Sequence, residues 1–336
     1  MKLLSIIVPC YNSEPFMAKC INSLLVGGDR VEIIIIDDGS KDKTGAIADE
    51  FALKYPDIIK VVHQPNGGHG EGINVGLGQA TGKFVKTVDS DDTLSDDFVE
   101  YLNILETSAK DADIVFNNYV YTYDDPSKNN PIRYRNMFKP NVIFTWNEVK
   151  KPQLKQFLMI HACTFKTEIA RKYGPELPKH CFYEDNLYIG KIKPHADKLF
   201  YCDMDLYGYT IGREGQSMAA EVMAKRYTHQ ILVCEMLFND WNLEAIKMKS
   251  KMLYKILMHE IQIMYAGACA FAMLSSDEKY YENLQNMWKK AIEHDEKNGK
   301  KLRYGFAMRM MNLKGKFGRK VAIFLYKLAH KIVKFN

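Results

Sequence analysis

The chain has 336 residues, 47% apolar and 26% charged, a composition typical of a folded globular protein with one large or two moderate domains. Its net charge of +5 is uneven, because residues 297–336 carry twelve basic and no acidic side chains while residues 1–296 carry a net charge of −7. An acidic body with a basic tail is not the profile of a nucleic-acid-binding protein, so no nucleic-acid partner is expected.

The seven cysteines show neither a CxxC pair nor the spacing of a metal site, and most lie within apolar segments. This distribution is typical of buried, reduced thiols in a cytoplasmic protein. The apolar run Leu3–Val8 is too short for a signal peptide. No apolar run reaches the roughly 18–20 residues that a membrane-spanning helix needs. We therefore expect a cytoplasmic body without a membrane span.

Strands and helices alternate with short connections over the first ninety residues. The apolar runs rich in β-branched residues are typical of strands covered on both faces. In chain order the pattern predicts a strand at 3–8, a helix at 15–26, a strand at 31–36, a helix at 44–55, a strand at 58–63, a Gly-rich loop at 64–72, a helix ending at 80, and a strand at 84–88. The alternation predicts an α/β fold: a mainly parallel open sheet flanked by helices.

Acidic residues follow two of these strands. Asp37-Asp38 ends the strand at 31–36, and Asp89-Ser90-Asp91-Asp92 ends the strand at 84–88. Ligands of open α/β sheets bind at the carboxyl ends of the strands. Adjacent carboxylates repel one another, and a divalent cation such as Mn²⁺ or Mg²⁺ relieves that repulsion. The alternative is an acidic turn that caps a helix opening at Ser95.

Two further segments carry possible chemistry. The run 65–72 holds four glycines in six residues, which lets backbone N–H groups approach an anion, although a mobile turn explains it equally well. It matches neither a P-loop nor a Rossmann fingerprint. The pair Glu184-Asp185 lies between aromatic residues at the start of an apolar-periodic segment, where the alternative is simple stabilisation of a helix N-terminus.

The middle of the chain is less regular, and the end is helical. We expect strands at 113–116 and 119–123, the second alternating as an exposed antiparallel strand does, a loop or hairpin at 124–140, a helix at 146–159, strands at 162–165, 199–202 and 206–211, and a loop at 212–217. Residues 218–296 contain almost no Gly or Pro and predict long helices, among them 227–238 and 250–274. The expected domains are residues 1–217 and a helical region, 218–336.

The tail is basic and amphipathic. From Arg319 onward the apolar positions 321, 324, 325, 328 and 332 follow helical spacing, with Lys and Arg beside them. This pattern favours a helix lying on an anionic membrane surface. A helix docked on the body or on a second subunit is the alternative, and a homo-oligomer stays open.

The order of these segments resembles family 2 glycosyltransferases, which are inverting enzymes of the glycosyltransferase-A fold, here of the bacterial polysaccharide and cell-wall glycan type. The resemblance covers residues 4–217 and rests on five motifs: Ile6-Ile7-Val8-Pro9-Cys10-Tyr11-Asn12, Ile36-Asp37-Asp38-Gly39-Ser40, Asn66-Gly67-Gly68, Asp89-Ser90-Asp91-Asp92 and Glu184-Asp185. It implies metal-assisted transfer of a hexosyl or N-acetylhexosaminyl group from a UDP-sugar to a hydroxyl of a glycan acceptor, free or lipid-linked.

The resemblance also implies roles for single residues. Asp185 would be the general base beside Glu184, Asp91 with Asp89 would hold Mn²⁺ or Mg²⁺, and Asp38 would accept a hydrogen bond from the uracil N3–H. The nucleotide-sugar site would comprise Pro9, Tyr11, Asn12, Glu14, Asp38, Asn66, Gly68, Asp89, Ser90 and Arg213.

One departure concerns the glycine loop. Gly72-Ile73-Asn74 stands where relatives often carry Ala-Arg-Asn, so the arginine is missing and His69 and Glu71 are candidates to serve instead. The sequence identifies no definite third metal ligand; His180 and His195 are candidates, and a core or surface role is the alternative for each.

These expectations place the enzyme in the cytoplasm, peripheral on the inner face of the cell membrane. The alternative function is a non-catalytic nucleotide-sugar-binding or scaffolding subunit of a glycan-synthesis complex. A nucleotidyltransferase is disfavoured, because the basic Gly-rich first loop expected for triphosphates is missing.

Overall fold

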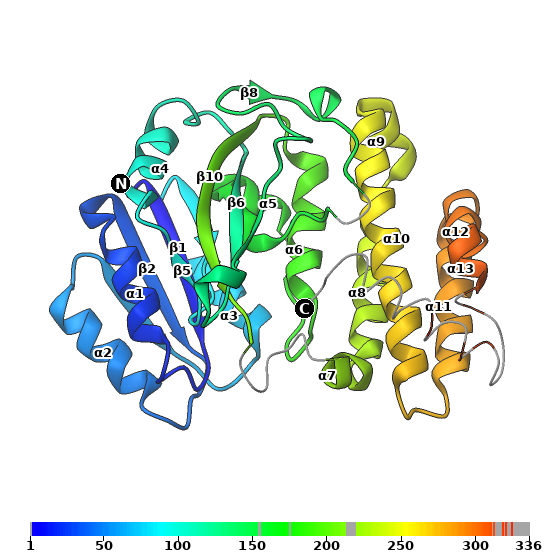
Figure 1. Cartoon of the computed structure of the whole chain (residues 1–336), viewed down its shortest axis with the longest axis horizontal. Coiled ribbons are helices and arrows are strands. Elements are labelled where there is room, and N and C mark those ends of the chain that lie inside the picture. The colour runs from blue at the N-terminus through cyan, green and yellow to red at the C-terminus, as the bar shows by residue number, and fades with distance from the viewer. Residues whose placement is uncertain are drawn as a thin grey trace. The chain divides into compact units, whose positions relative to one another are not determined.

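The computed structural model in Figure 1 describes residues 2–153, 156–174, 176–212 and 220–310, together with residues 312, 318, 320 and 324. The chain forms two compact units. The first comprises Met1–Pro152 and Leu158–Gly212, and the second comprises Gln153–Phe157 and Arg213–Asn336. The first unit is a mixed α/β structure, and the second, called the helical unit below, consists of helices.

The first unit is built on one ten-stranded sheet with the order β3-β2-β1-β4-β9-β6-β10-β5, in which β7 also pairs with β6 and β8 with β10. The strands are β1 Leu4–Cys10, β2 Val31–Asp37, β3 Ile59–His63, β4 Phe84–Thr87, β5 Thr93–Leu94, β6 Ile114–Thr122, β7 Asn130–Ile132, β8 Ile143–Phe144, β9 Cys163–Lys166 and β10 Leu199–Thr210. The predicted α/β fold with an open, mainly parallel sheet is therefore confirmed.

Strand direction determines where the functional edge lies. Strand β1 runs parallel to β2 and β4, β2 runs parallel to β3, and β6 runs parallel to β10. Strand β9 is antiparallel to both β4 and β6, so these two neighbours point the same way. The carboxyl ends of β1, β2, β3, β4, β6 and β10 therefore lie along one edge of the sheet.

Helices cover the sheet because its central strands are buried on both faces, as the unbroken burial of β1 and β2 shows. They are α1 Met17–Leu25, α2 Thr44–Lys54, α3 His69–Gln79, α4 Phe98–Glu106, α5 Thr167–Tyr173 and α6 Glu184–Ile192. Helix α3 lies very close to β1 through its glycines. A Cβ atom on Gly76 would lie 2.4 Å from Ile7 Cγ2, and one on Gly72 would lie 3.1 Å from Pro9 Cβ.

The elements up to residue 106 follow the predicted order, except that the short strand β5 was not predicted and the Gly-rich segment needs a correction. Helix α3 begins at His69, so the second half of the predicted 64–72 loop is helical. The predicted strands at 113–116 and 119–123 are one strand, β6, and those at 199–202 and 206–211 are one bulged strand, β10. The end of β6, predicted as an exposed antiparallel strand, is partly buried and pairs antiparallel with β7 on one side, but on the other side it pairs in parallel with β10.

The helix predicted at 146–159 is wrong within the described residues. Only Trp146–Glu148 forms a 3₁₀ turn, and the indole N–H of Trp146 donates to the carbonyls of Lys193 (3.2 Å) and Ala196 (2.8 Å). The apolar pattern there serves long-range packing, and Pro152 is unfavourable inside a helix. Helix α5 was not predicted.

The helical unit contains the predicted long helices. Its elements are α7 Ala220–Lys225, α8 Tyr227–Asp240, α9 Leu243–Lys249, α10 Lys251–Leu274, α11 Tyr280–His294, α12 Glu296–Arg303 and α13 Phe306–Met310. Tyr265 of α10 stacks on Trp288 of α11 with ring centroids 4.9 Å apart, and Trp288 Nε1 donates to Asn312 Oδ1 at 2.8 Å. The amphipathic helix predicted from Arg319 lies almost entirely outside the described residues.

Helix α10 corrects the expectation about membrane spans. By length and composition alone it is able to cross a membrane, but 72% of its apolar window is buried inside the protein, as in the core helix of a bundle. It is therefore weak evidence for a span. The seven cysteines are free and buried, as predicted.

Candidate active site

The acidic run 89–92 crosses from the end of β4 to β10. The N–H of Asp89 donates to the Tyr207 hydroxyl (3.1 Å), which in turn donates to Asp92 Oδ2 (2.7 Å). Thr210 donates its N–H to Asp92 Oδ1 and its hydroxyl to the carbonyl of Asp91, both at 2.8 Å. The run is therefore held on β10. It does not cap α4, which begins at Phe98 without a side-chain cap.

Three carboxylates of this run form a group that fits a divalent cation. One oxygen from each of Asp89, Asp91 and Asp92 lies within 4.8 Å of the other two. Asp92 is buried, and burial followed by the charge of Asp89 raises its pKa to about 8. Asp89 and Asp91 are half-buried and more accessible. Carboxylate oxygens are the ligands that Mg²⁺ and Mn²⁺ prefer, so Asp89 and Asp91 are the better placed pair.

His69, the first residue of α3, joins this run to the pair Glu184-Asp185. Its Nε2 lies 2.9 Å from Asp89 Oδ1, and its Nδ1 lies 2.7 Å from Glu184 Oε1. Burial alone lowers the pKa of His69, but the two carboxylates outweigh it and raise that pKa well above its usual value. A protonated imidazole therefore bridges acids from two distant segments. The sequence had presented His69 only as a candidate substitute for a missing arginine.

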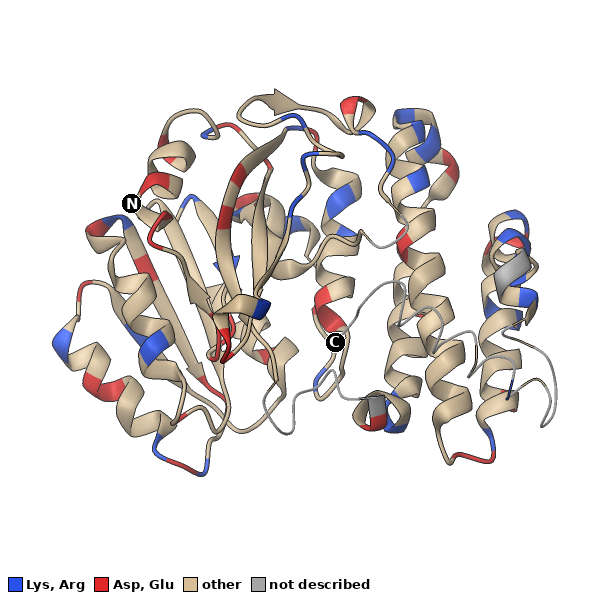
Figure 2. Cartoon of the chain, in the orientation of Figure 1, with Lys and Arg blue, Asp and Glu red and all other residues tan. Residues whose placement is uncertain are grey.

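Glu184 and Asp185 form the first turn of α6, which is red in Figure 2, and the residue before them, Tyr183, has a left-handed backbone with φ 69°. Glu184 is buried against His69, whereas Asp185 is half-buried and accepts a hydrogen bond from Asn186 Nδ2 at 2.9 Å. Burial and the neighbouring Glu184 raise the pKa of Asp185 to about 7. The helix N-terminus expected as the alternative is therefore present, and the same turn also supplies a carboxylate with the proton affinity of a general base.

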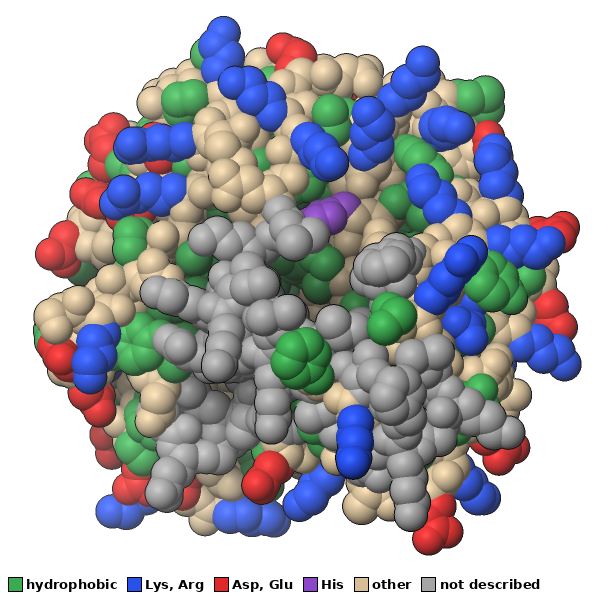
Figure 3. All heavy atoms as spheres, turned by 45° about the vertical axis from the view of Figure 1, so that its right-hand side comes forward, with side chains coloured by type: hydrophobic (Ala, Val, Ile, Leu, Met, Phe, Trp, Pro, Cys, Tyr) green, Lys and Arg blue, Asp and Glu red, His purple; other side chains and the backbone are tan. Residues whose placement is uncertain are grey.

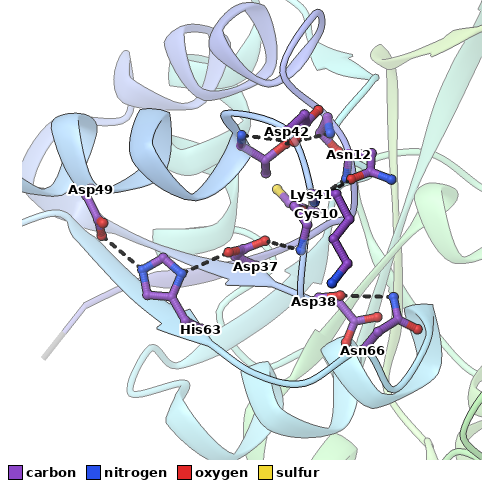
Figure 4. A network of polar contacts seen from close by, with 12 residues as sticks. Cys10, Asn12, Asp37, Asp38, Lys41, Asp42, Asp49, His63 and Asn66 are labelled. Carbon is purple, nitrogen blue, oxygen red and sulfur yellow. Dashed lines mark hydrogen bonds and ion pairs between the residues drawn. The ribbon is translucent and has the colours of Figure 1, made fainter.

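Asp38 organises the glycine loop (Figure 4). Its carboxylate accepts hydrogen bonds from the N–H groups of Gly67 (2.7 Å) and Gly68 (2.8 Å) and from Gln64 Nε2 (2.8 Å), and only 3% of the residue is exposed. Asn66 Nδ2 donates to the carbonyl of Asp38 at 2.9 Å. The anion held by these glycine N–H groups is thus a side chain of the protein itself.

Gly68 cannot be replaced freely at this position. Its φ of +87° favours glycine, and a Cβ atom there would lie 2.9 Å from the backbone nitrogen of His180. His180 in turn donates its N–H to the carbonyl of Gly67 at 2.8 Å. The turn at Gly67-Gly68 therefore connects the start of α3 with the residues before α6.

The loops after β1 and β2 are joined to each other. Asn12 Oδ1 accepts from the N–H of Lys41 (2.8 Å), and Glu14 Oε2 accepts from the N–H of Lys43 (3.1 Å). In Figure 4 the Lys41 side chain extends from Asn12 toward Asp38. The ring of Tyr11 is exposed (51%) beside this junction.

Two further contacts complete this side of the edge. The Ser13 hydroxyl lies 2.7 Å from the Ser90 hydroxyl and so ties the first loop to the acidic run. Asp37 has different partners from Asp38 (Figure 4). Its Oδ2 lies 2.9 Å from His63 Nδ1, and its Oδ1 accepts a hydrogen bond from the N–H of Ser40. Pro9 is buried in β1 against Gly72.

The structure thus brings most of the predicted site residues to the carboxyl edge of the sheet. Connected there by hydrogen bonds or chain neighbours are Pro9, Tyr11, Asn12, Glu14, Asp38, Asn66, Gly68, Asp89, Ser90, Asp91, Glu184 and Asp185. Arg213 lies outside the described residues. Among the described residues, the group able to hold a metal includes neither His180 nor His195, whose ring stacks on Tyr173 at 3.9 Å.

Comparison with known proteins agrees with this geometry. Residues 5–174 match the model of the family "Glycosyl transferase family 2". Glycosyltransferase GlyG of Streptococcus pneumoniae is 37% identical over 130 residues, which is 38% of this chain and 42% of GlyG. The uncharacterized glycosyltransferase EpsJ of Bacillus subtilis is 29% identical over 289 residues, 80% of this chain and 78% of EpsJ. The match to GlyG therefore spans less than half of that protein.

Among solved structures, S. aureus TarS 1–349 in complex with UDP-GlcNAc superposes with a TM-score of 0.69 at 20% identity. The superposition covers 99% of this chain and 92% of the TarS chain. At this level of identity the similarity concerns the fold. It extends over the helices as well as the sheet.

Proposed function

The chain belongs to glycosyl transferase family 2, and from this premise we propose that it is an inverting enzyme that moves a sugar from a UDP-sugar to a hydroxyl of a bacterial glycan. The observation that carries the proposal is the hydrogen-bonded series Asp89–His69–Glu184, with Asp185 next in the chain. It joins a cation-binding group to a carboxylate whose pKa of about 7 suits a general base.

In the proposed reaction Asp185 accepts the proton of the acceptor hydroxyl while that oxygen attacks the anomeric carbon of the donor. The bond from the anomeric carbon to the diphosphate oxygen breaks, and UDP leaves with the electron pair. A single in-line displacement of this kind inverts the configuration at the anomeric carbon. Glu184 is occupied by His69, so Asp185 is the carboxylate free to act as base.

On the donor side, Asp89 and Asp91 would hold Mn²⁺ or Mg²⁺. When bound, such a cation neutralises the charge of the diphosphate leaving group. The exposed ring of Tyr11 offers a stacking face for the base, and Asp38 places the glycine loop and Asn66 beside it. The complex of the structural neighbour TarS with UDP-GlcNAc supports a UDP-sugar as donor.

The proposal is tested with Asp91→Ala and Asp185→Asn, assayed for UDP release and sugar transfer with Mn²⁺ present. Each is expected to lower turnover by about 100-fold or more, because each removes a group that acts in the transition state. Asp96→Asn is the matched control, since Asp96 is an exposed carboxylate close in sequence and outside the metal-binding group. Wild-type rates of UDP release in both variants with every acceptor tried would reject the mechanism. UDP binding by the wild-type protein without any turnover would favour the non-catalytic subunit.

We also propose that the enzyme works at the cytoplasmic face of the membrane on an acceptor that is lipid-linked. The support is the charge distribution: residues 297–336 carry twelve basic and no acidic side chains. In the helical unit, the last turn of α12 contains Lys300, Lys301 and Arg303 (Figure 2). Figure 3 shows Lys and Arg side chains around the periphery of the face it views, with Asp and Glu side chains between them. Basic clusters of this kind are attracted to anionic lipid headgroups.

A further inference from the structure

Four tyrosines form a cross-strand ladder at the carboxyl ends of β6 and β10. Tyr119 is paired with Tyr207, and Tyr121 with Tyr209, in the parallel register of these strands. Residues two apart on a strand face the same side, and so do paired residues of neighbouring strands. The ring centroid of Tyr121 lies 5.3 Å from that of Tyr119 and 5.7 Å from that of Tyr209, and in both pairs the ring planes are nearly perpendicular. The four rings therefore share one face of the sheet.

The inner pair, Tyr119 and Tyr207, is buried, and Tyr207 is hydrogen-bonded to the acidic run. The hydroxyl of Tyr207 donates to Asp92 Oδ2 at 2.7 Å and accepts from the N–H of Asp89 at 3.1 Å. Tyr207 therefore connects the ladder to the acidic run that contains the proposed cation ligands.

His161, which is 3% exposed, packs against three of the four tyrosine rings. Its ring centroid lies 4.2 Å from that of Tyr119, 5.1 Å from that of Tyr207 and 5.0 Å from that of Tyr209. Burial lowers its pKa to about 3, and its Nε2 has no hydrogen-bond partner among the described residues. The aromatic group is thus closely packed and contains a buried polar atom without a hydrogen-bond partner among the described residues.

The outer pair, Tyr121 and Tyr209, is only half-buried. Burial raises the pKa of Tyr209, and the charges of Asp89, Asp92 and Asp185 raise it further. Tyr209 also precedes Thr210, which is hydrogen-bonded to Asp92 and to the carbonyl of Asp91.

We propose that Tyr121 and Tyr209 form the platform on which the sugar ring of the acceptor stacks, an inference that rests on the glycosyltransferase function proposed above. The faces of aromatic rings are electron-rich, and the C–H groups on one face of a pyranose ring carry partial positive charge, so the two surfaces attract each other. Stacking leaves the hydroxyls at the edge of the sugar ring free to approach Asp185. The chemical class of the acceptor terminus is accordingly a pyranoside rather than a phosphate or an open-chain polyol.

The strand order assigns this platform to the acceptor. The proposed nucleotide residues follow β1 and β2, the acidic run follows β4, and the tyrosine ladder lies on β6 and β10, beyond β9. The acidic run therefore separates the nucleotide side of the edge from the ladder. A donor whose diphosphate lies at Asp89 and Asp91 directs its nucleotide away from the ladder, and the ladder is left for the second substrate.

The test compares ring removal with hydroxyl removal, using Tyr121→Leu and Tyr209→Leu against Tyr121→Phe and Tyr209→Phe. The donors are UDP-GlcNAc, UDP-GalNAc, UDP-glucose and UDP-galactose with Mn²⁺. The acceptors are the p-nitrophenyl β-glycosides of the same four sugars. For the best pair, the Leu variants are expected to raise the acceptor KM by about tenfold or more, while the Phe variants stay within about threefold of wild type. The donor KM and acceptor-free UDP release are expected to stay unchanged, which also shows that the variants are folded.

Three outcomes would overturn the platform while leaving the proposed function intact: an unchanged acceptor KM in the Leu variants, equal damage by Phe and Leu, or a rise confined to the donor KM. Release of UDP without transfer to any glycoside of the panel would likewise exclude a pyranoside acceptor. Failure of the wild-type protein to turn over any UDP-sugar would instead reject the proposed function, and the platform with it.

Discussion

At the scale of single residues, the site depends on pairings that are distant in the sequence. His69 and Glu184 are 115 positions apart, yet their side chains are 2.7 Å apart and together with Asp89 link two helices and a strand end. The sequence indicated the acidic residues, because carboxylates at strand ends are a local pattern. It could not indicate that Asp38 would bind Gly67 and Gly68, or that His69 would bridge two acids, because both depend on the folded arrangement.

The raised pKa of Asp185 predicts the pH dependence of transfer. A general base acts only when deprotonated, and burial with the neighbouring Glu184 raises the pKa of Asp185 from 3.8 to about 7. As pH falls through that value the active fraction decreases, so kcat/KM should fall by about tenfold per pH unit below it. Rates measured from pH 5.5 to 8.5 check this, with Asp96→Asn expected to follow the wild-type profile. A flat profile between pH 5.5 and 7 would contradict the assignment of Asp185 as the base.

At the scale of elements, the contact between α3 and β1 places His69. Gly76 faces Ile7 so closely that an added Cβ would lie 2.4 Å from Ile7 Cγ2, whereas a Cβ on Gly78 of the same helix meets nothing within 4 Å. Gly76, packed against β1, and Gly78, which has free space for a Cβ atom, therefore form a matched pair for mutagenesis.

Gly76→Ala is expected to lower the free energy of unfolding by about 1–3 kcal/mol, because the added methyl group overpacks the α3–β1 contact. Gly78→Ala is expected to raise it by about 0.5–1 kcal/mol through helix propensity alone. Urea denaturation of the two variants and of the wild-type protein measures both changes. Equal effects of the two substitutions would show that α3 does not lie against β1 as described.

The elements also show how far sequence patterns reach. Most strands and helices up to residue 106 were predictable because the buried strands β1, β2 and β4 are short, largely apolar runs separated by Gly, Pro and Asn. Strand β6 was divided wrongly because Asn117 and Asn118 look like a break. In the fold both amides are buried and satisfied, Asn117 by Lys86 Nζ (3.0 Å) and Asn118 by Asp203 (3.0 Å). A polar pair inside a strand is tolerated when tertiary partners exist, and a sequence does not show those partners.

At the scale of the whole molecule, the proposed membrane role is tested by deleting residues 313–336. The deletion spares Asn312, which accepts the indole N–H of Trp288 at 2.8 Å and donates to the carbonyl of Met308 at 2.7 Å. Binding to anionic phosphatidylglycerol vesicles is expected to fall, because each Lys or Arg near such a surface contributes about 1 kcal/mol. Cosedimentation measures the change, and acceptor-free UDP-sugar hydrolysis is expected to stay the same.

Two controls distinguish electrostatic binding to anionic lipids from nonspecific adsorption to vesicles. Neutral phosphatidylcholine vesicles should bind both forms equally weakly. Replacing Lys327, Lys331 and Lys334 by Gln keeps the apolar positions and should weaken binding in the same direction as the deletion. Undiminished binding of the truncated protein to anionic vesicles would favour a tail that docks on protein.

The chain enters the helical unit twice, first with Gln153–Phe157 and again from Arg213 onward. A chimaera made with a relative by a single crossover after Gly212 would take residues 213–336 from one parent. Residues 153–157, which belong to the same unit, would still come from the other parent. Exchange of the complete helical unit therefore requires that residues 153–157 be replaced together with residues 213–336. Recombination during evolution faces the same restriction, which favours inheritance of both units as one block.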